Sequence, residues 1–350
     1  MNNISKVSLT ALCGSLVALT AVKAGEMTIA GSAVMTMTKK SGTTTGNPLG
    51  MKSNLTFSGA GELDGGQKVA LSIYNNDKNA YSSSEMSLTT NSLGSFALTQ
   101  GTGGAGIGGY DDNMPRAFEE TWDTGIGSGV DLAKGVGSST TLAYTTPSLG
   151  GTTLQIAYAG RNDGAQVSDK SSGGSTNALV GRGLDVVVNS TKDIGFASTT
   201  IFAGGSWTKQ DTATRLDGGD DIKDRTEGVA GATVVVGPVS AGWQRTLEYT
   251  GKNQEATDVF GYKNTSWGVA FNVNDDLSVS YAEFESIRGM VEHSNTGGGR
   301  PTTTIESMQV AYTMGGVGLK VAFNDLDNGT YTSGTANDAE RTLVMLSLAF

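Results

Sequence analysis

The candidate functional residues of this sequence are charged side chains of both signs. Five carboxylates lie within one long polar segment: Asp111, Asp112, Glu119, Glu120 and Asp123. Four bases lie elsewhere, on the phase of the predicted strands that carries the polar side chains: Lys52, Arg161, Lys320 and Arg341. Opposed across water, the two sets would produce a transverse electric field that orients dipolar solutes. The alternative is that they are ordinary solvated loop and rim charges.

Catalytic and metal-binding motifs have little support. The sole histidine, His293, lies in a polar segment beside Glu292, and sequence neighbours alone do not make a catalytic relay. Residues 101–106 match the dinucleotide fingerprint G-x-G-x-x-G, but no helix pattern follows, so a hinge for a loop is favoured. The acidic run 217–221 could hold Ca²⁺, although such runs are usually solvated loops. We therefore expect no enzyme activity, no metal and no cofactor.

The N-terminus has the pattern of a cleaved signal peptide. Lys6 precedes a mostly apolar stretch from Val7 to Val22, and Val22-Lys23-Ala24 offers a small-residue cleavage site. We expect residues 1–24 to be removed and residues 25–350 to form one domain; an uncleaved anchor helix is the alternative. The only cysteine, Cys13, falls within the signal, and Leu12 before it is too large for a lipidation site.

The composition is acidic and rich in glycine. The formal charge is −10, with 51 glycines and only 5 prolines among 350 residues. A chain this acidic lacks the basic face that non-specific nucleic-acid binding requires. Beyond the signal, no window holds 18 consecutive apolar residues, which argues against a helical membrane span.

Alternation with a period of two recurs along the whole chain and predicts strands. Val317, Leu319, Val321 and Phe323, for example, alternate with small or polar residues. The second face of these strands is mostly Ser, Thr, Gly, Ala, Asn and Gln with few charges, which suits an apolar face toward lipid and a polar face toward water. Ring-bearing residues near the predicted strand ends fit aromatic girdles at the two membrane interfaces: Tyr74, Tyr144, Tyr158, Trp207, Trp243, Tyr249, Tyr281 and Tyr312.

Short and long connections follow one another along the chain. Seven tight, turn-rich links are predicted, at 64–66, 91–94, 147–151, 191–195, 237–238, 274–276 and 315–316. Eight mostly longer links lie between them, at 39–50, 77–80, 101–137, 161–178, 209–221, 251–257, 289–302 and 327–338. Fifteen links give about sixteen strands with both chain ends on one side, as in membrane barrels with short periplasmic turns and long outer loops.

The fold class predicted is therefore all-β, a closed transmembrane antiparallel β-barrel. An open edge in lipid would leave backbone N–H and C=O groups unpaired at several kcal/mol each, so the sheet must close. We expect strands of about 9–11 residues, the length that a tilted strand needs to cross. Alternation is poor at 196–207 and 227–236, so the register there stays open.

The chain resembles the general-diffusion porins of Gram-negative bacteria, particularly the alphaproteobacterial type. The likeness lies in the signal, the first strand 27–31, the segment 114–125, and the terminal strand 346–350 that ends in Phe350. The resemblance implies a homotrimer in the outer membrane, with Phe350 read by the barrel-assembly machinery. It also implies that the third loop, 101–137, folds into the barrel and sets the constriction, with the five acids on the loop and the four bases on the wall.

The function expected from this resemblance is passive diffusion of small hydrophilic solutes and ions through a water-filled pore. The net acidity suggests a mild cation preference. A substrate-specific channel with a saturable solute site is the alternative left open.

Overall fold

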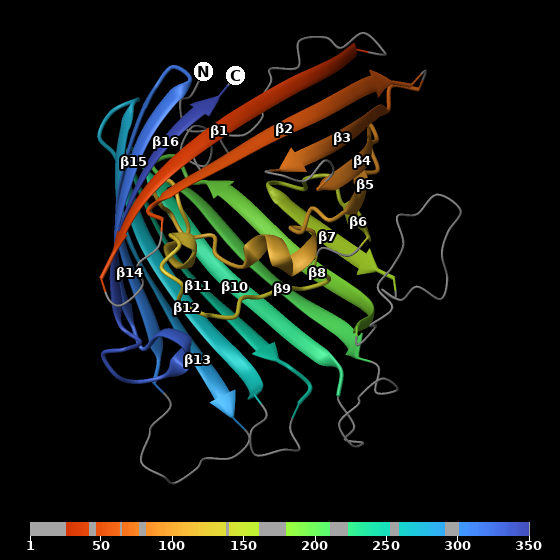
Figure 1. The fold of residues 1–350 in the computed structure, drawn as a ribbon. Helices are drawn as coiled ribbons and strands as arrows, with labels where there is room; N and C mark the ends of the chain where they lie inside the picture. The colour runs from red at the N-terminus through yellow and green to blue at the C-terminus, as the bar shows by residue number, and fades with distance from the viewer. Residues whose placement is uncertain are drawn as a thin grey trace.

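Sixteen antiparallel strands form one closed barrel in the computed structural model, which describes residues 26–41, 47–63, 65–76, 82–137, 140–160, 180–210, 223–252, 259–290 and 301–349 (Figure 1). The strands are β1 (Glu26–Lys40), β2 (Leu49–Glu62), β3 (Lys68–Asn76), β4 (Ser83–Thr89), β5 (Ser95–Gln100), β6 (Thr141–Thr145), β7 (Thr152–Ala159), β8 (Val180–Asp193), β9 (Ser198–Gln210), β10 (Arg225–Val236), β11 (Val239–Tyr249), β12 (Val259–Asn272), β13 (Leu277–Met290), β14 (Thr303–Met314), β15 (Val317–Asp327) and β16 (Ala339–Ala349).

The barrel closes between its first and last strands. β1 pairs with β2 on one side and with β16 on the other, where Ser32 lies opposite Ala349 and Lys40 opposite Arg341. Closure leaves no strand edge with unpaired backbone groups, which is what a sheet in hydrocarbon requires. The predicted number of strands is confirmed, and six of the seven tight links fall between consecutive strands. The seventh, predicted at 191–195, lies later along the chain, because β8 continues to Asp193 and β9 begins at Ser198. Much of the long links lies outside the described residues.

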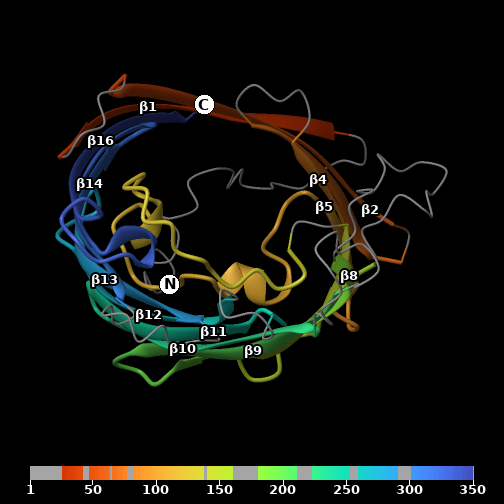
Figure 2. The ribbon, with the colours of Figure 1, turned by 60° about the horizontal axis from the view of Figure 1, so that its bottom comes forward.

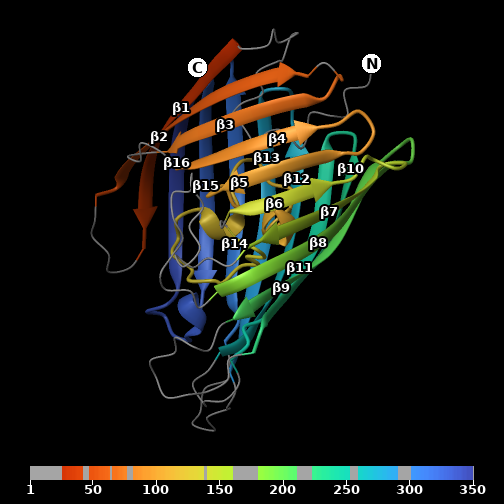
Figure 3. The ribbon, with the colours of Figure 1, turned by 90° about the vertical axis from the view of Figure 1, so that its right-hand side faces the viewer.

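The predicted strand length is wrong for much of the wall. β1 has 15 residues and β2 and β8 have 14, whereas β4 to β7 have only 5 to 8 (Figure 3). The register also runs without a break through the segment left open, since β9 pairs with β10 from Thr208–Arg225 to Ser198–Val235. Small residues there, including Gly204 and Gly205, weaken the sequence pattern, yet both stay paired with β10 in the same register.

Alternation sorts the side chains onto the two faces of the wall as predicted. The residues at Met308, Tyr312, Leu319 and Phe323 are between 43% and 51% exposed on the outside. Inward-facing neighbours such as Ser307, Gln309, Ala311 and Ala322 are small or polar and are buried inside the barrel. In the part of the chain that the structure describes, no helix has the length and apolar character needed to cross a membrane.

One residue expected in an aromatic girdle faces inward instead. Tyr74 on β3 lies opposite Thr56 on β2 and Ser83 on β4, and it lines a cavity inside the barrel together with Gln155. The apolar residues of β3, such as Leu71, occupy the opposite phase and face out. The aromatic character of Tyr74 suggested the outer face, but strand phase decides the side.

Candidate functional site: a loop fastened inside the barrel

The segment between β5 and β6 turns into the barrel instead of leaving it. Figure 2 looks into the barrel and shows this segment, in yellow and orange, inside the ring of strands. Gly101, Gly103, Gly104 and Gly106 have φ between +63° and +73°, a backbone region that favours glycine. The dinucleotide-like motif at 101–106 therefore acts as the bend that starts the loop, as the hinge interpretation predicted.

Asp185 on β8 fastens both arms of the loop to the wall. Its Oδ2 accepts hydrogen bonds from the backbone N–H of Ile107 (3.0 Å) on the outgoing arm and from that of Val136 (3.1 Å) on the returning arm. A Cβ added to Gly106 or to Gly135 would lie 2.2 Å from the same oxygen. The close approach of the loop to this carboxylate thus depends on glycine at both positions.

Glu227 on β10 makes a second attachment on the returning arm. Its two carboxylate oxygens accept the backbone N–H groups of Lys134 (2.8 Å) and Gly135 (3.0 Å). Arg225, on the same strand, donates to the carbonyl oxygen of Gly135 (2.7 Å) and lies 3.3 Å from Glu227. The charge of this buried carboxylate is therefore paired, which offsets part of its desolvation cost.

Inward-facing amides and hydroxyls continue the attachment along the wall. Gln244 on β11 donates to the carbonyl oxygens of Tyr110 (2.6 Å) and Asp111 (2.7 Å) and accepts the Asn113 N–H (2.9 Å). Gln309 on β14 donates to the carbonyl oxygen of Glu119 (2.7 Å). Uncharged polar residues on the lumen side, which the sequence presents as generic pore lining, are in fact hydrogen-bond partners of the loop backbone.

The five acids predicted for the constriction all lie on this loop, but in different surroundings. Asp112 is only 3% exposed, and its Oδ1 accepts the Met114 N–H (3.2 Å) and the Ser266 hydroxyl (3.5 Å) from β12. Its carboxylate thus lies between the loop and the wall. Asp123 is exposed, and the side chains of Asp111, Glu119 and Glu120 are half-buried.

Arg116 is held within the acidic stretch. Its guanidinium donates to Glu120 Oε1 (2.7 Å) and to the carbonyl oxygens of Asp112 (2.9 Å) and Met114 (3.1 Å). The positive charge of Arg116 is therefore paired within the loop itself.

Burial raises the pKa of every acid in the set. The pKa of Asp112 rises to about 6 and that of Glu120 to about 7, with Arg116 opposing the rise in both and the neighbouring carboxylates adding to it. Burial also raises the pKa values of Asp111 and Glu119, and that of Asp123, where the charge of Lys52 opposes the rise. Part of the negative charge on the loop is therefore titrated near neutral pH.

We expect this titration to make any cation preference pH-dependent. An acid with a raised pKa is charged above that value and neutral below it, so lowering the pH from 8 to 5 removes negative charge from the loop. The preference should fall with a half-change between about pH 6 and 7, read as the reversal potential across a salt gradient. A half-change near the ordinary carboxyl value of about 4 would contradict the assignment.

Three of the four predicted wall bases can be placed. The ammonium of Lys320 on β15 lies 5.8 Å from the centre of the Phe118 ring of the loop. Arg341 on β16 approaches the loop at Gly125, where an added Cβ would lie 3.0 Å from its Cζ. Lys52 on β2 is exposed, and Arg161 lies outside the described residues. Strand phase thus places Lys320 and Arg341 on the lumen side beside the acidic loop.

Lys40 at the end of β1 is a further inward base that was not predicted from the sequence. Its ammonium donates to the carbonyl oxygen of Ile126 on the loop (3.0 Å). The signal in the sequence was strand phase, because Lys40 lies on the same side of the β1–β2 pair as Lys52.

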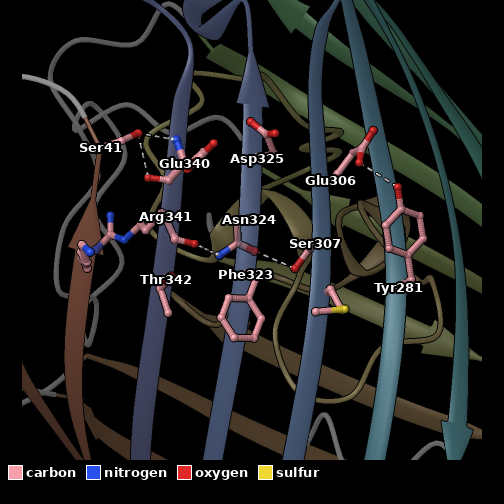
Figure 4. Close-up of a pocket in the computed structure, with 12 residues that line it drawn as sticks. Ser41, Tyr281, Glu306, Ser307, Phe323, Asn324, Asp325, Glu340, Arg341 and Thr342 are labelled. Atoms are coloured by element: carbon pink, nitrogen blue, oxygen red, sulfur yellow. Dashed lines mark hydrogen bonds between the residues drawn. The ribbon is translucent and has the colours of Figure 1, made fainter.

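The outer face carries a row of carboxylates where β13 to β16 approach their long links. Glu306 lies opposite both Glu283 and Asp325, and Asp325 lies opposite Glu340. Figure 4 shows three of them above Phe323, with Glu306 accepting the Tyr281 hydroxyl (2.9 Å). Like charges directly opposite one another destabilise a sheet, and ionised groups are costly in hydrocarbon. The row therefore marks the end of the apolar belt.

Several other sequence predictions fall on residues that the structure does not describe. These are the signal peptide 1–24, the acidic run 217–221, His293 and the terminal Phe350. Among the residues that are described, no group of three or more His, Cys, Asp or Glu side chains is arranged to hold a metal ion.

Known structures resemble this barrel over nearly its whole length. OmpF of Salmonella typhi, solved in complex with daunomycin, shares 14% identity over 93% of this chain and 97% of its own, with a TM-score of 0.65. An anion-selective porin from Comamonas acidovorans shares 15% identity over 93% and 99% of the two chains, with a TM-score of 0.59. This chain has the porin fold.

The similarity to known proteins is detected in the fold and not in the amino-acid sequence. No protein-family model and no curated protein sequence matches the chain. A third porin-fold structure, OprB of Pseudomonas putida, shares only 8% identity while covering 93% of this chain and 94% of its own, with a TM-score of 0.62. At such identities the likeness establishes the sixteen-stranded architecture, and the chemistry of the pore depends on this chain's own residues.

Proposed function

We propose that the protein is a porin of the Gram-negative outer membrane, through which small hydrophilic solutes and ions diffuse passively. The observation that carries the proposal is a closed sixteen-stranded barrel with an apolar outer face and one long loop fastened inside it. A barrel of this size encloses a water-filled lumen, and a loop held within it narrows that lumen. The solved porins of the same fold support this reading.

The acids of the loop and the bases of the wall are proposed to set ion preference. Glu119 and Asp123 supply negative charge from the loop, and Lys320 and Arg341 supply positive charge from β15 and β16. Asp111, Glu120 and Arg116 shape the same field, while Asp112 contributes from beneath the loop. Opposed charges at a narrow point orient dipolar solutes and favour one sign of ion.

The remaining features complete the proposal. Residues 1–24 are a cleaved export signal, residues 25–350 form the barrel domain, and Phe350 is part of the assembly signal. The short turns face the periplasm and the long links face outward. The protein acts as a homotrimer and has no enzymatic activity; small residues of β9 and β10 suit contact with a second subunit.

Single-channel conductance of the refolded protein in a planar bilayer is the test. We expect stepwise conductance, in groups of three for a trimer, that grows with salt concentration without saturating. The reversal potential under a salt gradient gives the ion preference. A correctly folded barrel that carries no current would overturn the proposal.

A further inference from the structure

The polar cavity lined by Tyr74 and Gln155 lies inside the barrel, against the wall of short strands at the start of the loop. It has a volume of about 430 Å³ and lies between the inner faces of β3 to β7 and loop residues 102–105. These strands run from orange to yellow-green in Figure 3, and Figure 2 shows the loop leaving the wall at β5. The volume falls within the range of about 300–1,000 Å³ typical of small-molecule sites.

The polar side chains of this cavity differ from those that hold the loop. Tyr74, Asn76 and Glu85 line it, yet within the described part of the chain none of their side chains forms a hydrogen bond or ion pair. The hydroxyl of Thr102, at the loop side, is buried without a partner. Only Gln155 is committed, since its Oε1 accepts the Gly106 N–H (2.8 Å). The cavity thus holds polar groups that the fold itself does not use.

The register places these groups around one point. Glu85 on β4 lies opposite Ser72 on β3 and Thr99 on β5, and Tyr74 lies opposite Ser83, so Tyr74 and Glu85 are diagonal neighbours on one face. Asn76 follows Tyr74 on the same face, at a spacing of about 6.6–6.8 Å along the strand. An aromatic ring is therefore flanked by a carboxylate on one side and a carboxamide on the other.

This combination fits a polyhydroxylated ligand. A carboxylate accepts two hydroxyl groups, a carboxamide both donates and accepts, and a tyrosine ring packs against the C–H face of a sugar while its hydroxyl bonds at the edge. No Lys or Arg lines the cavity, which disfavours an anion, and the single carboxylate tolerates a neutral solute that donates hydrogen bonds. The chemistry therefore selects neutral sugars over anions.

We propose that this cavity is a saturable binding site for neutral oligosaccharides beside the diffusion path. The inference rests on the proposed pore function and deepens it, because a weak site of this kind raises the local concentration of one solute class at the constriction. Ions and small solutes still diffuse past the loop without binding at this site.

Block of the single-channel ion current by maltotriose tests the site. We expect the block to saturate with maltotriose concentration in the wild type, whereas polyethylene glycol of the same size gives no saturation. Glu85→Gln and Tyr74→Ala should each raise the half-saturating concentration about tenfold, which corresponds to about 1.4 kcal/mol. Tyr74→Phe, which keeps the ring and loses the hydroxyl, should give a smaller increase.

Glu119→Gln is the matched control, because it removes one carboxylate from the loop away from the cavity. It should alter ion preference and leave the half-saturating maltotriose concentration as in the wild type. Wild-type block that matches that of the glycol, or an equal loss of block in Glu119→Gln and Glu85→Gln, would overturn the site. Either result would leave the pore function intact, whereas absence of any current would overturn the pore function itself.

Discussion

Asp185→Ala is expected to raise the single-channel conductance roughly twofold, toward that of a barrel with an unobstructed lumen. The substitution removes the one oxygen that accepts N–H groups from both arms of the loop, at Ile107 and Val136. Two buried N–H groups left without an acceptor cost about 1–3 kcal/mol each, so the loop should leave this position on the wall. Single-channel recording and the largest uncharged polymer that enters the pore give the readout.

Two matched variants separate this effect from general damage to the barrel. Asp185→Asn keeps an acceptor oxygen at nearly the same place and should stay closer to the wild-type conductance. Asp193→Ala removes a carboxylate at the last residue of the same strand, where it accepts the Gly195 N–H of the following turn, and should leave the conductance unchanged. Wild-type conductance in a folded Asp185→Ala barrel would mean that the other attachments hold the loop without Asp185.

Neutralising the two sides of the constriction is expected to shift ion preference in opposite directions. The double substitution Glu119→Gln and Asp123→Asn should lower the cation-to-anion permeability ratio about threefold, because it removes negative charge from the loop. Lys320→Gln with Arg341→Gln should raise the ratio by a similar factor, since both bases lie on the lumen side beside the loop. Reversal potentials under a salt gradient measure both.

The sign of the two shifts matters more than their size. If these charges were ordinary rim charges, high salt would screen them and both doubles would behave like the wild type. A Lys39→Gln variant serves as control, because Lys39 is exposed on the phase of β1 opposite to that of Lys40. Shifts in the same direction for both doubles would contradict a transverse field and indicate a change in the loop position.

The barrel could be predicted from the sequence because its determinants are local. Alternation along segments such as 317–323 reflects the two faces of each strand, and the turn residues at 237–238 and 315–316 mark where strands must end. The alternation of short and long links then fixes the number of strands. Porins that share only 8–15% identity with this chain have the same fold, because many different sequences satisfy the same alternation of outward apolar and inward polar residues.

Predictions from local patterns were wrong for features that depend on where a residue lies within the closed sheet. Strand length was predicted as uniform, whereas β6 has five residues and β1 has fifteen, because the turn signals mark links but not where pairing stops. Tyr74 was placed in an outer girdle on its residue type, and its phase puts it inside. Asp112 was grouped with the pore-facing acids, and contact with Ser266 turns it to the wall.

Local patterns are enough to predict a sixteen-stranded barrel, most of its tight turns, the phase of Lys320 and Arg341, and a long acidic segment with a glycine bend at its start. How that segment is held depends on the tertiary structure. Asp185 and Glu227 lie 78 and 93 residues from loop groups that they bind, and nothing in their local sequence distinguishes them from other inward-facing acids. Strand periodicity is set by neighbouring residues, whereas a hydrogen bond between the wall and the infolded loop forms only once the sheet has brought these distant residues together.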